Sequence, residues 1–238
     1  MQLASSPADA DGPAIGKREQ GVADRRRRLI KAATELLTER EDGSFSMPEL
    51  ARRAQVSLAT PYNLFGSKAA VLAQVFERLA HGFNRDPAWM SGLGAADRIL
   101  GVIDRLTLAY EQQGRLFRSL WRALYGLDLA EQGDLNLSLS NEIVRPLVNG
   151  LATDRLLIEN VPAHVLELTL ARIFEANFEQ WAAQDWTASQ LRDHLQAGFA
   201  LVFIGLVGPA DKARLNDAMQ DAAQRLPVAP TARDVTNP

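Results

Sequence analysis

The sequence predicts an all-α protein in which a three-helix helix-turn-helix domain precedes a larger helical domain. Three observations predict this fold. Apolar residues recur at three- and four-residue spacing along most of the 238-residue chain, no long segment alternates as a strand would, and capping residues precede short apolar segments near the N-terminus. The hydrophobic content of 47% is enough for a substantial core. We expect about nine to ten helices in total.

The first two predicted helices follow an N-terminal tail. Residues 1–20 are rich in Ala, Ser, Pro, Asp and Gly and have no periodicity, so we expect them to be disordered. Apolar residues then recur at helical spacing over 24–40, and the residues EDGS end that helix. Ser46 can cap a second helix over 47–54, with Glu49 three positions further on to complete a capping box.

Two further helices follow at close spacing. After the turn QVS, Ser57 is placed to cap a short third helix, and the residues FGSK break it before Ser67 caps a fourth. Two short helices joined by such a turn make a helix-turn-helix, whose second helix can present its N-terminal residues to the major groove of DNA.

The chain beyond residue 90 also has helical periodicity. Pro146 should kink or split one of these helices, whereas Pro162 and Thr187 mark the starts of two others. The expected helices span residues 95–114, 115–127, 137–157, 162–184, 187–208 and 210–225.

Charge is unevenly distributed along the chain, although the formal net charge is only −3. Residues 17–85 hold 13 Lys and Arg against 8 Asp and Glu, a balance of +5, and the remainder holds 13 against 21, a balance of −8. A basic N-terminal region joined to an acidic C-terminal region indicates an N-terminal module that meets an anion such as nucleic acid.

Several classes of protein are excluded by composition. The sequence has no cysteine, so it has no disulfide, no thiolate zinc site and no cysteine nucleophile, which favours a cytoplasmic protein. We find no secretory signal pattern, and the longest apolar run, residues 197–208, is shorter than the roughly 18 to 20 residues of a membrane span. We therefore expect no membrane partner.

Four motifs follow one another between residues 25 and 77. They are IKAATELL in the first helix, SMPELARRAQVS at the second, SLATPYNLF at the third and SK at the start of the fourth. In this order they resemble the DNA-binding domain of the TetR family of bacterial transcriptional regulators. The resemblance implies a homodimer that binds double-stranded DNA at a pseudo-palindromic operator, commonly under the control of a small-molecule effector.

The resemblance also implies roles for individual side chains. Lys68 resembles the family's phosphate-binding lysine at the start of the fourth helix, where its charge adds to the helix dipole. Tyr62 resembles the tyrosine whose hydroxyl reaches a phosphate, and Thr60 the hydroxyl residue near the backbone or a base edge. Ser46 resembles the residue whose hydroxyl and amide meet a phosphate.

Base contacts are expected from Leu58, Ala59 and Asn63, the aliphatic side chains against thymine methyl groups and Asn63 toward adenine. Two residues depart from the family's pattern. Pro61 stands where an aliphatic residue is usual and can rigidify or reorient the third helix, and we expect it, like Ser57, at the DNA-contacting surface. Leu64 stands where the family often has His or Tyr, which leaves Asn63 as the main polar side chain for bases.

The arginine run at residues 25–28 is a further candidate for DNA contact. Such a run usually forms a solvated face, but Arg25 or Arg26 can reach a phosphate or the minor groove from the start of the first helix.

The site residues also have a purely structural interpretation. Ser46 and Ser57 can serve only as caps, Tyr62 as a half-buried aromatic residue, and Lys68 as a solvated charge.

A dimer interface is expected on the last apolar helix. In the TetR family the last two long helices pair with their copies, and a stripe of apolar residues here could serve this purpose or belong to the core of one chain. Two glycines on an adjoining face would let another backbone approach. The expected interface residues are Leu191, Leu195, Gly198, Phe199, Val202, Gly205 and Leu206.

An effector pocket is expected between two aromatic stripes. The stripes fall at helical spacing, which is also typical of core residues, and Asn177 and His164 can serve as polar groups beside them. Family members commonly bind a small molecule in this domain, and aromatic walls suit a largely apolar ligand. The aromatic residues are Phe117, Trp121, Tyr125, Phe174, Phe178 and Trp181.

The sequence thus predicts a helix-turn-helix DNA-binding domain over 21–82, a regulatory and dimerisation domain over 83–228 and a disordered tail over 229–238. No catalytic or metal-binding motif accompanies the three histidines, so neither an enzyme nor a cofactor is expected. The alternative is a helical protein-interaction adaptor, which would leave the basic N-terminal region unexplained. Salt distinguishes the two, because phosphate contacts weaken steeply as salt rises.

Overall fold

The computed structural model describes residues 16–83, 86–128, 135–158 and 161–227. Within these residues there is no β-strand, and one isolated antiparallel bridge joins Leu157 to Val207. A helix with the length and apolarity needed to cross a bilayer is not found in this part of the chain. The helices are α1 (Lys17–Glu39), α2 (Met47–Arg53), α3 (Ala59–Phe65), α4 (Lys68–Phe83), the 3-10 helix η1 (Pro87–Met90), α5 (Ala95–Gln112), α6 (Gly114–Tyr125), α8 (Leu135–Thr153), α9 (Ala163–Gln184), α10 (Ala188–Phe203) and α11 (Pro209–Ala223).

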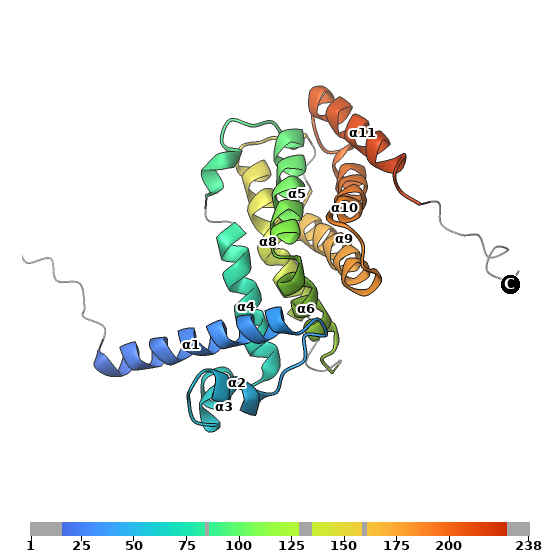
Figure 1. Ribbon diagram of the computed structural model, residues 1–238. Helices are drawn as coiled ribbons and strands as arrows, with labels where there is room; N and C mark the ends of the chain where they lie inside the picture. The colour runs from blue at the N-terminus through green and yellow to red at the C-terminus, as the bar shows by residue number, and fades with distance from the viewer. Residues whose placement is uncertain (1–15, 84–85, 129–134, 159–160, 228–238) are drawn as a thin grey trace, which may run out of the picture.

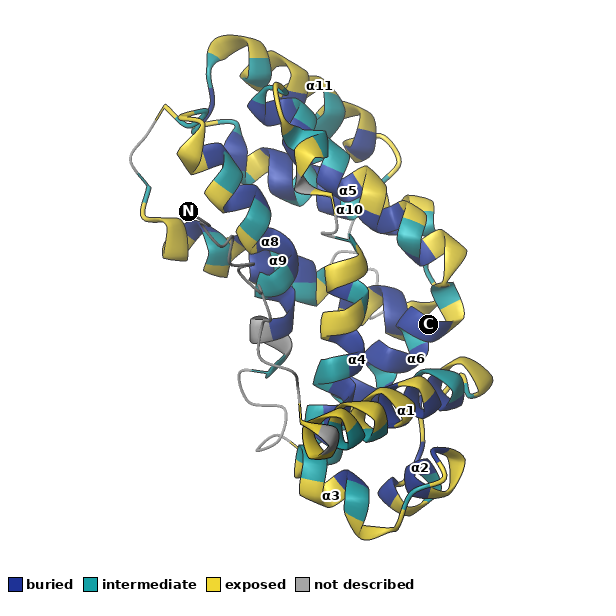
Figure 2. Cartoon of the chain, turned by 90° about the vertical axis from the view of Figure 1, so that its left-hand side faces the viewer, coloured by how far each residue is buried: buried dark blue, intermediate teal, exposed yellow. Residues whose placement is uncertain are grey.

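Helices α1 to α4 form a small unit at one end of the molecule, and α4 runs from it into the larger group of helices (Figure 1). Fully buried leucines at the helical spacing seen in the sequence hold the unit together, among them Leu29 and Leu36 of α1, Leu50 of α2 and Leu72 of α4. The outer faces of α1 and α3 remain exposed (Figure 2). The partly buried Leu64 and Phe65 of α3 pack against this core, which holds α3 at the surface of the unit.

The larger group of helices packs around a cluster of aromatic side chains from α5, α6 and α9. Their ring centroids lie 4.0 to 6.2 Å apart in stacked, tilted and edge-on pairs, the geometries that aromatic rings favour. The Trp121 indole N–H donates to the hydroxyl of Tyr110 at 3.2 Å. We call this the aromatic cluster: Tyr110, Phe117, Trp121, Tyr125, Phe174, Phe178 and Trp181.

Helix α6 joins the small unit to the rest of the protein. The Ser119 hydroxyl donates to the carbonyl of Arg40 at 2.7 Å, and the Arg122 guanidinium donates to the carbonyl of Glu41 at 3.1 Å. Both acceptors lie in the loop between α1 and α2. On its other side Arg122 donates to the carbonyl of Ala182 at 2.9 Å, so α6 connects that loop to the end of α9.

Gly43 in the same loop is required for this connection. Its φ is +67°, and a Cβ at this position would lie 2.1 Å from the carbonyl oxygen of Ser119. We expect Gly43→Ala to lower the free energy of unfolding by about 2 to 3 kcal/mol, since it adds backbone strain to a steric clash. Gly92 is the matched control, because its φ is +75° and a Cβ there meets nothing within 4 Å.

Urea unfolding of both variants measures the difference between them. Gly92→Ala should lower the free energy of unfolding by only about 1 kcal/mol, because it adds the strain of the left-handed backbone and no clash. Equal losses in the two variants would show that the contact between Gly43 and α6 does not contribute to stability.

Several predicted boundaries differ from the structure at the N-terminal end. Helix α1 begins at Lys17, so residues 17–20, expected to be disordered, are helical; the carboxylate of Glu19 accepts from the amide of Gly16 at 3.3 Å and caps the extra turn. The rest of the predicted tail, residues 1–15, lies outside the described residues. The predicted capping box of α2 is half formed, because Ser46 accepts from the amide of Glu49 but the Glu49 carboxylate pairs with Arg40.

In the larger group, α8 is one helix through Pro146 and is not split there. The buried neighbours Val144 and Leu147 hold this helix against its surroundings, which offsets the missing amide of the proline. Pro162 and Thr187 precede α9 and α10 as predicted, and Thr187 forms a full capping box with Gln190. Helix α10 ends at Phe203, short of the predicted 208. The predicted tail over 229–238 lies outside the described residues.

Candidate nucleic-acid interface

Helix α3 presents one exposed face to solvent. Leu58 is 59% exposed and Tyr62, one turn further on, is 50% exposed, which is high for large apolar side chains. Ala59 and Asn63 are exposed beside them. This face therefore combines apolar surface with one amide, as a helix that reads base edges requires.

The other face of α3 holds the helix in place. Pro61 is buried, and Leu64 and Phe65 are half-buried against the core. The guanidinium of Arg26 donates to the carbonyl of Leu64 at 2.8 Å and lies over the ring of Phe65, 5.1 Å from its centroid. Arg26 thus ties α1 to the end of α3. Pro61, expected at the DNA-contacting surface, is instead buried.

The turn before α3 has a left-handed residue at Gln55, with φ of 54°. The amide of Val56 donates to the carbonyl of Ala51 at 3.0 Å, which ends α2 in the manner of a Schellman motif. The guanidinium of Arg28 reaches the carbonyl of Gln55 at 3.5 Å. The turn is therefore fixed from α1 as well as from α2.

Ser57 does not cap α3 through its side chain. The residue at the cap position is Leu58, and the hydroxyl of Ser57 lies 2.7 Å from that of Thr60. The amide of Thr60 instead donates to the carbonyl of Ser57 at 2.9 Å. Both hydroxyls remain at the start of the helix, where Ser57 is exposed and Thr60 is half-buried.

The starts of α2 and α4 are brought together by Phe45. The ammonium of Lys68, the first residue of α4, lies 4.8 Å from the centroid of the Phe45 ring, and Phe45 directly precedes Ser46, the cap of α2. Ser67 caps α4 as predicted, with its hydroxyl accepting from the amide of Ala70 at 3.1 Å. Two hydroxyls and a cation thus lie near the N-terminal ends of two helices, where an anion is favoured.

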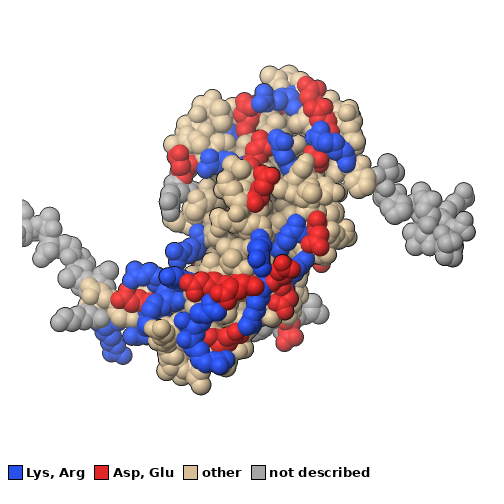
Figure 3. Space-filling model, viewed as in Figure 1, with Lys and Arg blue, Asp and Glu red and all other residues tan. Residues whose placement is uncertain are grey.

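The basic residues of the small unit are only partly neutralised within it. Arg53 pairs with Glu39 at 2.7 Å, and this contact lowers the pKa of the Glu39 carboxyl. Arg27 pairs with Asp24. Lys and Arg side chains nevertheless cover much of α1 and the helices below it, with acidic side chains between them (Figure 3). Arg25 is half-buried on α1, and Arg52 is exposed at the end of α2.

Most of the residues predicted to line a ligand pocket pack against one another. The members of the aromatic cluster other than Tyr125 are at most 7% exposed, so they form core instead of an open site. The Tyr125 hydroxyl donates to the carbonyl of Glu175 at 3.1 Å, and the Asn177 amide donates to the carbonyl of Ile173 at 2.7 Å. His164 is exposed at the start of α9. Neither predicted polar group faces a ligand cavity.

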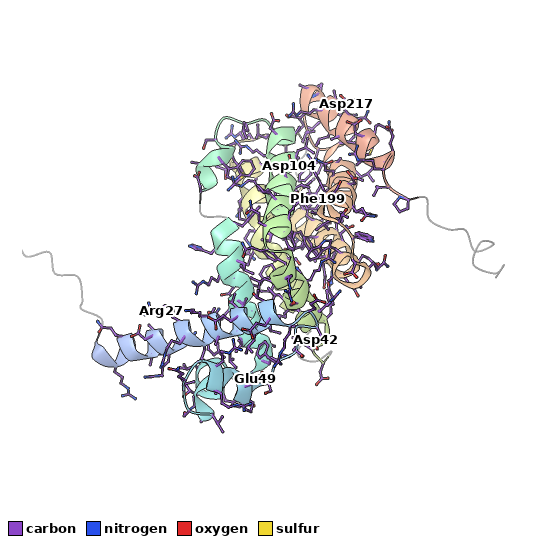
Figure 4. All side chains as sticks on the ribbon, in the orientation of Figure 1. Arg27, Asp42, Glu49, Asp104, Phe199 and Asp217 are labelled. Atoms are coloured by element: carbon purple, nitrogen blue, oxygen red, sulfur yellow. The ribbon has the colours of Figure 1, made fainter. Side chains whose placement is uncertain are left out.

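A cavity of about 830 Å³ lies instead between α1, α4, α5 and α6. Of the predicted pocket residues only Phe117 lines it, together with Tyr110 from the same cluster. The α1 side of the cavity includes Arg27, which projects from α1 toward the larger group of helices (Figure 4). We call this space the α1 cavity. Its walls come from helices far apart in sequence, so no local pattern could have identified it.

The predicted interface residues divide into two groups. Leu191, Leu195 and Phe199 are fully buried within one chain, and Phe199 lies in the core of the larger group (Figure 4). Gly198 faces the chain's own Ile173, whose side chain would lie 2.8 Å from an added Cβ. These four residues therefore pack within the protomer, because α10 is covered by α5, α9 and α11.

The remaining interface residues lie at the surface. Val202 and Leu206 are half-exposed, and Gly205 is exposed with open space around it. Leu201, which the sequence reasoning missed, is 65% exposed on the same helix. Leu201 directly precedes Val202, so it lies on the helix face next to the predicted stripe. Its apolar side chain at that position was the signal in the sequence that could have identified it.

A two-helix motif whose second helix is exposed, set on a larger helical domain, is typical of DNA-binding transcriptional regulators. Residues 29–75 match the family model for bacterial regulatory proteins of the tetR family. This segment therefore has the sequence of a DNA-binding domain of the tetR type, and the chain is similar to transcriptional regulators of that family. No curated protein sequence matches it significantly.

Solved structures of this family share the fold. FadR of Thermus thermophilus, a TetR-family transcriptional repressor in complex with lauroyl-CoA, aligns with a TM-score of 0.62 and 20% identity over 77% of this chain and 95% of its own. The repressor QsdR of R. erythropolis aligns with a TM-score of 0.56 and 20% identity over 76% and 94%. FadR of Bacillus subtilis in complex with stearoyl-CoA aligns with a TM-score of 0.53 and 16% identity over 75% and 98%.

Proposed function

We propose that the protein is a homodimeric, sequence-specific repressor of transcription in the bacterial cytoplasm, released from a pseudo-palindromic operator by a small effector. The observation that carries the DNA-reading role is the exposed face of α3, which is fixed from below by Pro61 and from the side by Arg26. A rigid helix that exposes Leu58, Ala59, Tyr62 and Asn63 suits insertion into the major groove.

Phosphate contacts are assigned to Ser46, Tyr62 and Lys68. Their positions at helix starts and on the exposed face would fix the register of α3 without reading sequence. Arg25 is assigned to a phosphate or the minor groove, whereas Arg26 is occupied by its contact with α3. Ser57 and Thr60 then supply hydroxyls beside the first base contacts.

The dimer is assigned to the exposed side of α10 and the start of α9. No Asp, Glu, Lys or Arg occurs between Asp193 and Asp211, although Leu201 in this run is 65% exposed. Val165 and Leu168 of α9 are also exposed. Such an uncharged apolar face is suited to burial against a second copy. A dimer would also double the number of base pairs read.

The repressor and effector assignments rest on the solved relatives and on the α1 cavity. The Thermus thermophilus and R. erythropolis proteins are described as repressors, and both FadR proteins hold acyl-CoA molecules. The volume of the α1 cavity, about 830 Å³, lies within the range of small-molecule sites. An effector bound there shifts the DNA-binding equilibrium only if it prefers one conformation of the protein.

Substitution of Asn63 tests the reading role of α3. We expect Asn63→Ala to relax preference at one base position of each half-site by about 1 to 3 kcal/mol, because its amide can pair with adenine. Competition between duplexes that differ at single positions measures this preference. Asn216→Ala, an exposed asparagine of α11, is the matched control. An unchanged preference profile for Asn63→Ala would remove this residue from base readout.

A further inference from the structure

The α1 cavity has a cationic lining. Four of its lining residues are cationic, namely Arg27, Lys31, Arg78 and Arg105, against the single carboxylate of Glu35. That carboxylate is shared by two cations, since Lys31 lies 3.9 Å and Arg53 3.7 Å from its oxygens. Arg27 is itself paired with Asp24 of α1, so the excess positive charge of the lining lies mainly on Arg78 and Arg105.

Two of these cations have no carboxylate partner among the described residues. Arg78 of α4 and Arg105 of α5 are exposed, and no Asp or Glu oxygen in the described part of the chain lies within 4.0 Å of either. Arg105 lies over the ring of Trp89, 5.1 Å from its centroid, which orients it without neutralising it. Both are available to an anionic group of a ligand.

The rest of the cavity is apolar. Buried lining side chains come from four helices and include Val75 and Phe76 of α4, Leu106 and Tyr110 of α5, Leu116 and Phe117 of α6, and Ile143 of α8. Leu108, which also lines the cavity, is 53% exposed and offers apolar surface that a ligand would cover. Burial raises the pKa of the Tyr110 hydroxyl, so the wall of the cavity stays uncharged on this side.

We propose that the α1 cavity binds an anionic amphiphile, a molecule with an apolar chain that ends in a carboxylate or phosphate group. The apolar chain of the ligand lies against the apolar side chains of α4, α5 and α6, and its anionic group contacts Arg78 and Arg105. A neutral apolar molecule would give the cationic side chains no anionic partner. A small polar anion would leave the apolar walls in contact with water.

The position of the cavity links the ligand to the DNA-binding unit. Arg27, Lys31 and Thr34 line it from α1, the helix whose neighbouring residues Arg26 and Arg28 hold α3 and the turn before it. A ligand in the cavity thus contacts the DNA-binding unit directly. This regulatory consequence rests on the proposed function, whereas binding of the amphiphile does not.

Calorimetry on the full chain without DNA tests the binding itself. The probes are lauroyl-CoA, dodecanoate, dodecanol and coenzyme A, each below its critical micelle concentration. Lauroyl-CoA, dodecanoate or both should bind at least tenfold more tightly than dodecanol and coenzyme A, and the preferred anion identifies the head group as phosphate or carboxylate. Equal binding of dodecanol, or no binding of either anionic probe, would overturn the proposal.

Surface variants then locate the site. Arg78→Gln combined with Arg105→Gln should weaken the anionic probes by about tenfold or more and leave dodecanol unchanged. Arg172→Gln, an exposed arginine of α9 outside the cavity, is the matched control and should bind as the parent does. Equal affinity of the double variant and the parent would place the ligand elsewhere.

A cavity-filling variant gives an independent reading. Ala109→Phe places a ring at the cavity wall and should reduce binding of the anionic probes by at least tenfold, and thermal unfolding shows whether the variant is folded.

Measurement of DNA affinity with and without the probes separates this proposal from the proposed function. If the probes bind but leave DNA affinity unchanged, the site stands and effector control fails. If DNA binds but no anionic probe does, the site fails and the DNA-binding role stands.

Discussion

Lys68→Ala is expected to weaken binding to every DNA sequence by about the same factor, roughly tenfold or more for a dimer in which two phosphates are no longer bound. The reason is the position of Lys68 at the start of α4, held over Phe45 beside the cap of α2. Tyr62→Phe should act in the same direction through removal of its hydroxyl. Such interactions with phosphate add affinity without sequence information.

Fluorescence anisotropy with operator and unrelated duplexes across a salt series measures this effect. The slope of log affinity against log salt should fall by about 0.9 for each phosphate that the protein no longer binds, hence by nearly two for a dimer carrying Lys68→Ala. Lys212→Ala, an exposed lysine of α11, is the matched control. A change of sequence preference with intact affinity would show that Lys68 does not bind phosphate.

Leu201→Asp is expected to convert the dimer to a monomer and to weaken operator binding by roughly a hundredfold or more. Leu201 is 65% exposed within a run that has no charged residue, and burial of a carboxylate against a second copy is costly. The loss in DNA affinity follows because two half-sites are no longer bound by one linked pair of reading helices.

Sedimentation equilibrium of the variant gives the oligomeric state directly. Leu108→Asp is the matched control, since Leu108 is 53% exposed but lines the α1 cavity, and this variant should keep the oligomeric state of the parent. Leu201→Asp that remains dimeric would exclude this face of α10 from the interface.

The parts of the fold that depend on local sequence were predictable. The caps by Ser46, Ser67 and Thr187 each use a hydroxyl three positions before its partner amide, so the spacing alone identifies them. Ser57 has the same spacing and failed as a cap, because the hydroxyl of Thr60 provides a competing partner at 2.7 Å. The local sequence thus identifies candidate cap residues, and a neighbouring hydroxyl can prevent one of them from capping the helix.

The parts that depend on long-range packing were not predictable. Leu191, Leu195 and Phe199 form an apolar stripe that suits either a core or an interface, and burial by α5, α9 and α11 decides for the core. The aromatic residues of α6 and α9 likewise pair across the domain, Trp121 with Phe178 at 5.5 Å among them. The α1 cavity, which these aromatic residues only border, is formed by helices that meet through tertiary structure alone.

The central claim is that a dimer of this chain reads operator DNA with α3. Selection of bound fragments from random double-stranded DNA by the purified protein, at about 100 mM salt where phosphate binding still contributes, tests it most directly. The account predicts an enriched motif with two-fold symmetry, whose half-sites lie about one helical turn of DNA apart or a multiple of it. Failure to enrich any motif, with the effector-free protein shown to be folded, would contradict it.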